Sequence, residues 1–297
     1  MKRIVILSGI VMITGCFHRS APSFDKTLYQ SRDFTAENQF SRNIEGPNFD
    51  RNGNLFVVNF GQDGSIGKIG TDGKGEIFLN LPGKSIANAI QFNRQGDMLL
   101  ADFIGHNILK VNPVTKEVQV FCHEDRFNQP NDICITKNDV LYASDPNWQN
   151  QTGQVWRIDP NGKATLLLEN QGTTNGIELS PDEKTLYVNE SIQRKIWAYD
   201  VDKKGNLKNK RIFTEFTDFG MDGMKCDKKG NLYCTRYGKG VVAVFSPDAK
   251  LLREIPLKGK DCSNLTFGGK DGKTVFVTLQ DRKGMEQFRV ETPGKGY

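Results

Sequence analysis

Six acidic or amide side chains stand at matching places in a pattern that recurs along the chain. Each precedes, by nine to eleven residues, the first apolar residue after a polar turn; they are Glu45, Asn88, Asn131, Asn175, Asp222 and Asn264. Two carboxylates and four amides supply hard oxygen ligands without sulfur or imidazole. Ca²⁺ takes six to eight such oxygens at about 2.3–2.6 Å and tolerates irregular geometry, whereas Mg²⁺ needs a stricter octahedron and Zn²⁺ or Cu²⁺ usually binds His or Cys. If folding gathers these residues, they indicate a divalent-cation site, with Ca²⁺ as the best match.

Turn formation offers another explanation for the same residues. Asn, Asp and Gly are frequent wherever a chain turns, which accounts for one or two of the six positions. It does not explain why one class of residue occupies the same register six times, so a metal site is the favoured interpretation.

The elements that must position these residues are six copies of one hairpin pattern. Each copy has a short alternating apolar run, a polar turn with Gly or Asp, and a second apolar run, which is typical of a β-hairpin. The first apolar residues after the turns lie 42 to 46 residues apart and are Leu55, Met98, Val140, Leu186, Leu232 and Val275. This period matches a four-stranded blade of about 40–50 residues. The sequence therefore predicts an all-β fold, a six-bladed β-propeller with four-stranded antiparallel blades around a central channel.

The last copy ends near residues 288–290 without a fourth strand. We expect residues 36–43 to supply it, because a closing strand from the opposite terminus removes an open sheet edge. One propeller domain then covers residues 36–297, and its six innermost strands begin at one end of the channel. The six acids and amides are expected to form a ring at that mouth.

The N-terminus begins with a short basic and apolar segment. Lys2-Arg3 precedes the apolar stretch Ile4 to Ile13, which is too short to cross a bilayer as a stable helix, and Cys16 follows a small residue. This stretch resembles a bacterial lipoprotein signal, which implies cleavage before Cys16 and lipidation of its thiol. A secretory signal with a chance cysteine is the alternative. We therefore expect a signal peptide over residues 1–15, a tether over residues 16–35, and lipid anchoring in the cell envelope, at the outer membrane facing the periplasm.

Composition and cysteine content limit the possible functions. The chain is 37% hydrophobic and 25% charged with a net charge of +5, which suits a soluble globular protein. No Lys/Arg block stands out, so a nucleic-acid partner has little support. Five cysteines remain beyond Cys16, and an odd count does not suggest a disulfide framework. Cys226 and Cys234 flank a turn and could pair in an oxidising compartment, although buried free thiols are the favoured interpretation.

Short motifs around the ring residues add a family resemblance. In chain order they are Ile44-Glu45-Gly46-Pro47, Gln129-Pro130-Asn131-Asp132, Thr174-Asn175-Gly176-Ile177, Met221-Asp222-Gly223-Met224 and Asn264-Leu265-Thr266-Phe267-Gly268-Gly269. This ordered set resembles the SMP-30/gluconolactonase/LRE-like family over nearly all of residues 40–292. The resemblance implies a six-bladed propeller with a divalent ion, usually Ca²⁺, at the channel mouth. It assigns Glu45, Asn175 and Asp222 as metal ligands, and Asn131 as a ligand or near-ligand that also meets substrate.

Within that family the chain is most similar to the gluconolactonase-like subgroup. Pro130-Asn131-Asp132 followed by Ser144-Asp145-Pro146 resembles the subgroup's third blade, although Asn147-Trp148 stands where Pro-Tyr is frequent. The resemblance implies a Ca²⁺-dependent hydrolase of small lactones, in which the metal polarises the carbonyl and Asp222 is general base or nucleophile, unless Asp222 serves only as a ligand. The expected substrate-binding residues are Asn88, Asn131, Asn264, Arg126, Trp148 and Arg236.

A second class of function stays open. Propellers host many activities, so the chain could be a non-catalytic ligand-binding or scaffold protein that keeps a metal ion for structure. A scaffold does not need two carboxylates at a channel mouth, which favours the hydrolase.

Overall fold

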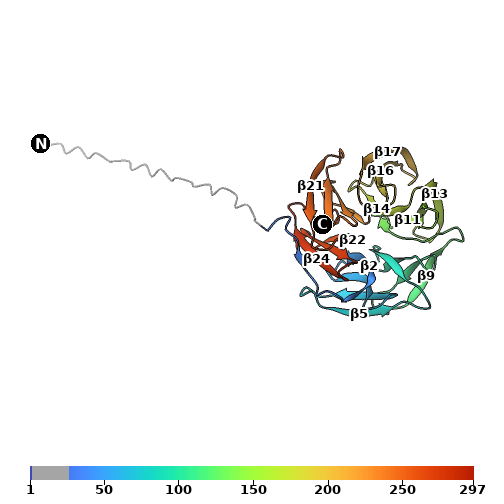
Figure 1. Ribbon diagram of the computed structural model, residues 1–297. Coiled ribbons are helices and arrows are strands. Elements are labelled where there is room, and N and C mark those ends of the chain that lie inside the picture. Colours follow the sequence, from blue (N-terminus) through green and yellow to red (C-terminus); the bar gives the residue numbers. More distant parts are fainter. Residues whose placement is uncertain (2–26) are drawn as a thin grey trace.

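The computed structural model describes residue 1 and residues 27–297, and every regular element within them is a β-strand. The strands form six four-stranded antiparallel sheets arranged as blades around one axis (Figure 1), which confirms the predicted propeller. No helix in the described part is long and apolar enough to cross a membrane. The predicted signal peptide and Cys16 lie outside the described residues, apart from Met1.

Each blade contributes one strand to each of four concentric positions. The innermost strands are β2 (Phe40–Phe49), β6 (Ala87–Phe92), β10 (Ile133–Ile135), β14 (Thr174–Leu179), β18 (Met224–Cys226) and β22 (Cys262–Gly268). The second strands are β3 (Leu55–Phe60), β7 (Met98–Asp102), β11 (Leu141–Asn147), β15 (Thr185–Glu190), β19 (Leu232–Arg236) and β23 (Thr274–Leu279). The third strands are β4 (Ser65–Ile69), β8 (Asn107–Val111), β12 (Thr152–Ile158), β16 (Lys195–Val201), β20 (Val241–Phe245) and β24 (Gly284–Arg289). The outermost strands are β5 (Gly75–Asn80), β9 (Val118–His123), β13 (Ala164–Gln171), β17 (Leu207–Glu215), β21 (Leu251–Pro256) and β1 (Arg32–Asp33).

The core lies between the blades. Alternating apolar residues of one sheet pack against the facing sheet, as where Phe56 and Val58 of β3 share a cluster with Met98 and Leu100 of β7. The innermost strands also contact one another around the ring, from β2 through β6, β10, β14, β18 and β22 back to β2. Burial between blades therefore fixes the six innermost strands side by side around the channel.

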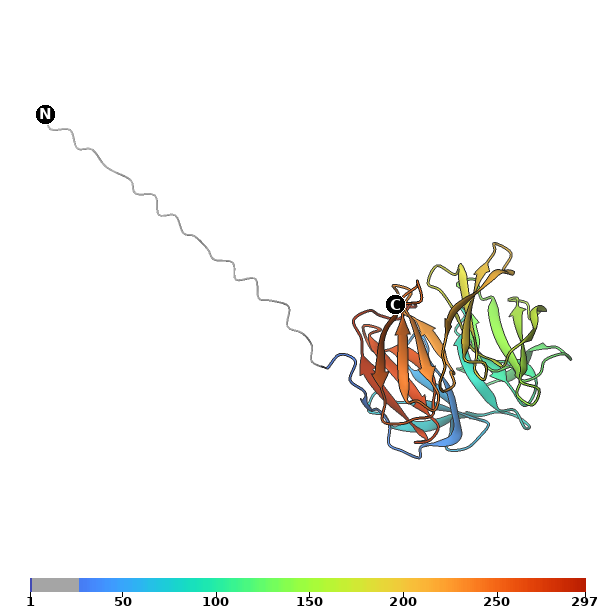
Figure 2. The ribbon, with the colours of Figure 1, turned by 45° about the horizontal axis from the view of Figure 1, so that its top comes forward.

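The ring closes with a strand from the N-terminus, but not with the expected residues. β1 pairs with β24, with Arg32 opposite Gln287, so residues 32–33 complete the last blade. The prediction that residues 36–43 would do so was wrong, because Phe40 already begins β2 and pairs with Phe60 in the first blade. Figure 2 shows the first described residues along the outside of the last blade. The folded part thus includes residues that we expected in the tether.

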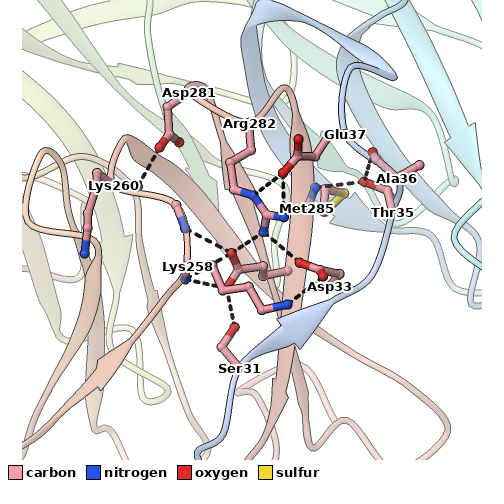
Figure 3. A network of polar contacts seen from close by, with 12 residues as sticks. Ser31, Asp33, Thr35, Ala36, Glu37, Lys258, Lys260, Asp281, Arg282 and Met285 are labelled. Atoms are coloured by element: carbon pink, nitrogen blue, oxygen red, sulfur yellow. Dashed lines mark hydrogen bonds and ion pairs between the residues drawn. The ribbon is translucent and has the colours of Figure 1, made fainter.

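A buried carboxylate holds this closure together (Figure 3). The side chain of Glu286 in β24 is fully buried, and Arg282 Nη1 lies 2.7 Å from Glu286 Oε1. Arg282 also binds Asp33 of β1 at 2.7 Å, and Ser31 Oγ donates to Glu286 Oε2 at 2.6 Å. One arginine therefore joins the N-terminal strand to the last blade.

Replacing Arg282 by Met is expected to lower the free energy of unfolding by about 2–4 kcal/mol, because it leaves the buried Glu286 carboxylate short of a partner. The matched control is Arg211→Met, which breaks an exposed pair with Asp200 and should change stability by less than about 1 kcal/mol. Urea unfolding measures both variants. Equal losses in the two would contradict the proposed role of Arg282.

The cysteines on the strands are free thiols. Cys122, Cys134, Cys226, Cys234 and Cys262 are all buried and unpaired. Cys226 lies opposite Leu232 and Cys234 opposite Met224, so the two cysteines that flank the turn do not face each other. The interpretation as buried free thiols is confirmed for these five residues.

Candidate functional site

Five of the six predicted ring residues lie close to the starts of the innermost strands, at one end of the channel, and Glu45 lies in the middle of β2. Four of them fall inside those strands at shifts of the pairing register, namely Glu45, Asn88, Asn175 and Asn264. Asn131 and Asp222 stand two residues before β10 and β18, and their N–H groups donate to Ser144 O at 2.9 Å and Thr235 O at 3.1 Å. Local irregularity of this kind changes the direction of a side chain. The repeat therefore places a carboxylate or amide at a break in the ladder in four blades and at the edge of the ladder in the other two.

Glycines draw adjacent ring residues together. A Cβ atom added to Gly176 would lie 2.2 Å from the carbonyl oxygen of Asp222, and one added to Gly223 would lie 2.0 Å from Asn264 Oδ1. No larger residue fits at either position without movement of the neighbouring strand. The close approach places Asn175 beside Asp222, and Asp222 beside Asn264.

The two ring carboxylates have different surroundings. Glu45 is only 2% exposed, and its Oε2 accepts from Gly46 N at 2.6 Å and Asn264 Nδ2 at 2.9 Å. Asp222 is half-buried and forms a hydrogen bond with the Asn175 side chain. Glu45 is thus fixed in the wall of the channel, whereas Asp222 keeps part of its surface exposed. Asn264, expected to bind substrate, holds Glu45 in place.

Two ring amides have buried oxygens without a hydrogen-bond partner. These are Asn131 Oδ1 and Asn175 Oδ1. An unsatisfied buried acceptor costs about 1–3 kcal/mol, and coordination to a cation would remove that cost. With Glu45 and Asp222 they form a set of oxygen donors that suits Ca²⁺. In the described part of the chain no three His, Cys, Asp or Glu side chains gather as a metal-binding group, so an ion at the ring would depend on the amide oxygens.

The carboxylates at the mouth repel one another. Burial and then the Asp132 charge raise the pKa of Glu45 to about 8. Burial, Glu45 and Asp132 raise the pKa of Asp222 well above its usual value. Buried acids that raise the pKa of one another favour either protonation or a bound cation.

A second set of charges, which the sequence analysis missed, occupies the channel beyond the ring. Asp132 Oδ2 is buried without a hydrogen-bond partner, and Lys225 Nζ lies 3.8 Å from Glu178 Oε2. Although burial lowers the pKa of Lys225, the charges of Asp132 and Glu178 raise it above its usual value. Lys295, near the C-terminus, also binds Glu178 and donates to Leu179 O at 2.9 Å. Glu178 and Lys225 each stand three residues after a ring residue, which is the signal that could have revealed them.

The Asp145 carboxylate fixes the loop that carries Asn131. The carboxylate accepts from Asn128 N at 2.9 Å and from Gln129 N at 2.6 Å, directly before Pro130 and Asn131. Trp156 Nε1 donates to the same carboxylate at 3.0 Å. Burial raises the pKa of Asp145 to about 6. Asp145 therefore positions Asn131.

The remaining predicted substrate-binding residues differ in position. Asn88 is half-buried, whereas Arg126 and Trp148 are exposed on loops at the ring end. The Arg126 guanidinium lies 5.2 Å from the ring centroid of the buried Trp156. Arg236 is fully buried, and its Nη2 donates to Asp218 O and Oδ1, both at 2.7 Å. Arg236 therefore holds the loop before β18 and does not present its guanidinium to the mouth.

A hollow of about 1140 Å³ lies at the other end of the channel. The hairpin turn Asp50 to Gly53 and the C-terminal residues Gly294 to Tyr297 line it, together with Glu178 and Lys225. The charged residues inside the channel thus lie between this hollow and the ring.

Comparisons with known proteins agree with this geometry. The family model of the SMP-30/Gluconolactonase/LRE-like region matches residues 43–281. The chain belongs to this family. A gluconolactonase from Zymomonas mobilis is 30% identical over 271 residues, which cover 79% of this chain and 75% of that protein.

Solved structures of the family share the fold. The calcium-binding protein regucalcin from Agrobacterium tumefaciens matches with a TM-score of 0.78 at 20% identity, over 90% of this chain and 97% of its own. A gluconolactonase from Xanthomonas campestris matches with a TM-score of 0.75 at 21% identity, over 89% of each chain. At these identities the likeness establishes the six-bladed architecture.

Proposed function

We propose that this protein hydrolyses small lactones at the ring mouth. The observation that carries the proposal is that the ring holds two carboxylates, Glu45 and Asp222, together with the buried amide oxygens of Asn131 and Asn175, which have no hydrogen-bond partner. The chain is also 30% identical to a gluconolactonase. A ligand-free scaffold would gain nothing from two acids that repel each other at an open mouth.

We propose Ca²⁺ as the ion, with Glu45, Asn131, Asn175 and Asp222 as its protein ligands. When bound, the ion would polarise the lactone carbonyl and stabilise the developing oxyanion. The rigid contacts of Glu45 with Gly46 and Asn264 would keep one ligand fixed, and the Asp145 hydrogen bonds would keep Asn131 in position.

Asp222 is the residue that we propose as general base or nucleophile. Unlike Glu45, it is half-buried, so we propose that its carboxylate takes a proton from water or attacks the carbonyl. The Asn175 hydrogen bond orients it. Arg126 and Trp148, exposed at the mouth, are proposed to contact the substrate with Asn88 and Asn131.

Acid release from glucono-δ-lactone and from aliphatic lactones tests this function. We expect hydrolysis with Ca²⁺ and a loss of more than tenfold in rate with a chelator. No hydrolysis of any lactone, ester or organophosphate at any metal loading would leave the scaffold function as the alternative.

Metal-free protein is expected to lose stability as the pH rises from about 5 to 8. The pKa of Glu45 is about 8 in the folded chain against an ordinary 4.5, so the folded state binds more protons than the unfolded state within this window, and stability falls as they leave. Ca²⁺ should therefore raise Tm more at pH 8 than at pH 5, as thermal unfolding can measure. Glu45→Gln should weaken both the fall of metal-free stability with pH and the larger gain in Tm from Ca²⁺ at pH 8. A metal-free Tm that rises between pH 5 and pH 8 would contradict the raised pKa of Glu45.

We further propose that Cys16 carries a lipid anchor that holds the protein at the outer membrane facing the periplasm. Such an anchor would leave the ring accessible, because Leu28 bridges to Arg289 at the end of β24 that lies away from the ring. Replacing Cys16 by Ser should release the protein from the membrane fraction. Retention of the variant would argue against the anchor.

A further inference from the structure

Four large apolar side chains are exposed on the loops at the ring end of the propeller. Innermost strands begin at the ring and second strands return to it, so the loops between second and third strands, and between successive blades, open at that end. Their exposed apolar residues are Ile104 at 42%, Trp148 at 40%, Ile192 at 41% and Phe219 at 49%. We call these four residues the apolar rim. Grouped apolar exposure of this kind marks a contact surface.

Hydrogen bonds join the loops that carry three of these residues. Gln193 Nε2 donates to Gln151 O at 3.1 Å, which links the Ile192 loop to the Trp148 loop. Ser191 Oγ donates to Met221 O, which links the Ile192 loop to the Phe219 loop. The three loops that carry Trp148, Ile192 and Phe219 are therefore held against one another.

Phe219 is presented by a strained and anchored backbone. Its φ of 39° lies in the left-handed region, which is unfavourable for a bulky residue. The flanking carbonyls of Asp218 and Gly220 accept from the buried Arg236 at 2.7 and 3.3 Å. Strain of this kind persists only where the surroundings enforce it, and it accumulates at functional places.

The other side of the mouth is polar. Strand β2 exposes Arg42 and Asn43, and loops of the first and last blades expose Asp63, Lys260 and Asp281. A molecule seated over the ring thus meets apolar side chains on one side and charged ones on the other. A polyhydroxylated lactone alone would leave the apolar rim in water.

We infer that the apolar rim binds an alkyl or aryl substituent of the lactone, so that the preferred substrates are lactones with one apolar arm. This inference rests on the proposed lactonase function. Contact with a membrane is less favoured, because the chain leaves the propeller at the end away from the ring, where Leu28 meets Arg289.

The test compares the double variant Ile192→Ser/Phe219→Asn with Ile212→Ser/Leu252→Ser. Asn tolerates the left-handed backbone at position 219, and the control residues are 45% and 46% exposed on the outermost strands. Wild type and control should show kcat/KM rising about threefold per methylene over the first few carbons of an alkyl-δ-lactone series. The rim variant should lose this dependence and keep its rate on glucono-δ-lactone within about threefold. A rim variant with an unchanged chain-length dependence would overturn the inference.

Binding separates this inference from the lactonase proposal. Calorimetry with a non-hydrolysable alkyl-δ-lactam series should give affinities that rise with chain length in wild type and not in the rim variant, even if no lactone were hydrolysed. Hydrolysis without any chain-length effect in wild type would refute the rim and keep the lactonase. A further outcome is that vesicles of phosphatidylethanolamine and phosphatidylglycerol bind the wild type but not the rim variant, while lactam affinity does not depend on chain length. That outcome would refute the substrate-binding role of the apolar rim and indicate a membrane-binding surface.

Discussion

Asp222→Asn is expected to lower kcat for lactone hydrolysis by about a thousandfold, because an amide can neither take the proton from water nor attack the carbonyl. The substitution keeps the shape of the side chain and removes one of the charges that repel Glu45. The metal-free variant should therefore fold and have a Tm equal to or above that of the wild type.

The matched control for this variant is Asp125→Asn. Asp125 lies in a loop at the same end of the propeller, and its side chain is 97% exposed, so its activity should stay within about twofold. Steady-state rates with saturating Ca²⁺ separate catalysis from metal loading. An Asp222→Asn enzyme with more than a tenth of the wild-type kcat would leave Asp222 as a ligand only.

Lys225→Met is expected to have the largest effect on stability, a loss of about 3–5 kcal/mol in the free energy of unfolding. The Lys225 side chain is 13% exposed and faces Glu178, which is 1% exposed, and its charge also acts on the buried Asp132. Without Lys225, the buried Asp132 would lose the positive charge that favours its ionised form.

A double-mutant cycle checks the cause of that loss. Lys229→Met, on an exposed hairpin turn, should be neutral, and adding Asp132→Asn to Lys225→Met should recover part of the lost stability. Denaturant unfolding without metal gives each value. A loss below about 1 kcal/mol, or no recovery in the double variant, would refute charge compensation inside the channel.

The blade count and the ring were predictable because both depend on the repeat. The anchors from Leu55 to Val275 recur at one period, and counting back from each gives the ring residue. The structure places five of the six close to the starts of their innermost strands and Glu45 in the middle of β2, since the pattern within each blade is local in sequence. The family assignment is confirmed by the match over residues 43–281.

Long-range contacts were not predictable in the same way. Ser31 and Asp33 meet Glu286 and Arg282 across almost the whole chain, and no local pattern marks residues 32–33 as the closing strand. Lys225 and Lys295 reach Glu178 from different parts of the sequence. Arg236 looked like a free cation until its burial against Asp218 and Gly220 was visible.

The most direct test of the central claim is a Ca²⁺ titration of chelator-treated protein, followed by calorimetry and by lactonase rate in the same samples. We expect one ion per chain, activity restored in proportion to the bound ion, and loss of both in Glu45→Gln. Full lactonase activity with no bound metal, or tight Ca²⁺ binding unchanged in Glu45→Gln, would contradict a catalytic ion at the ring.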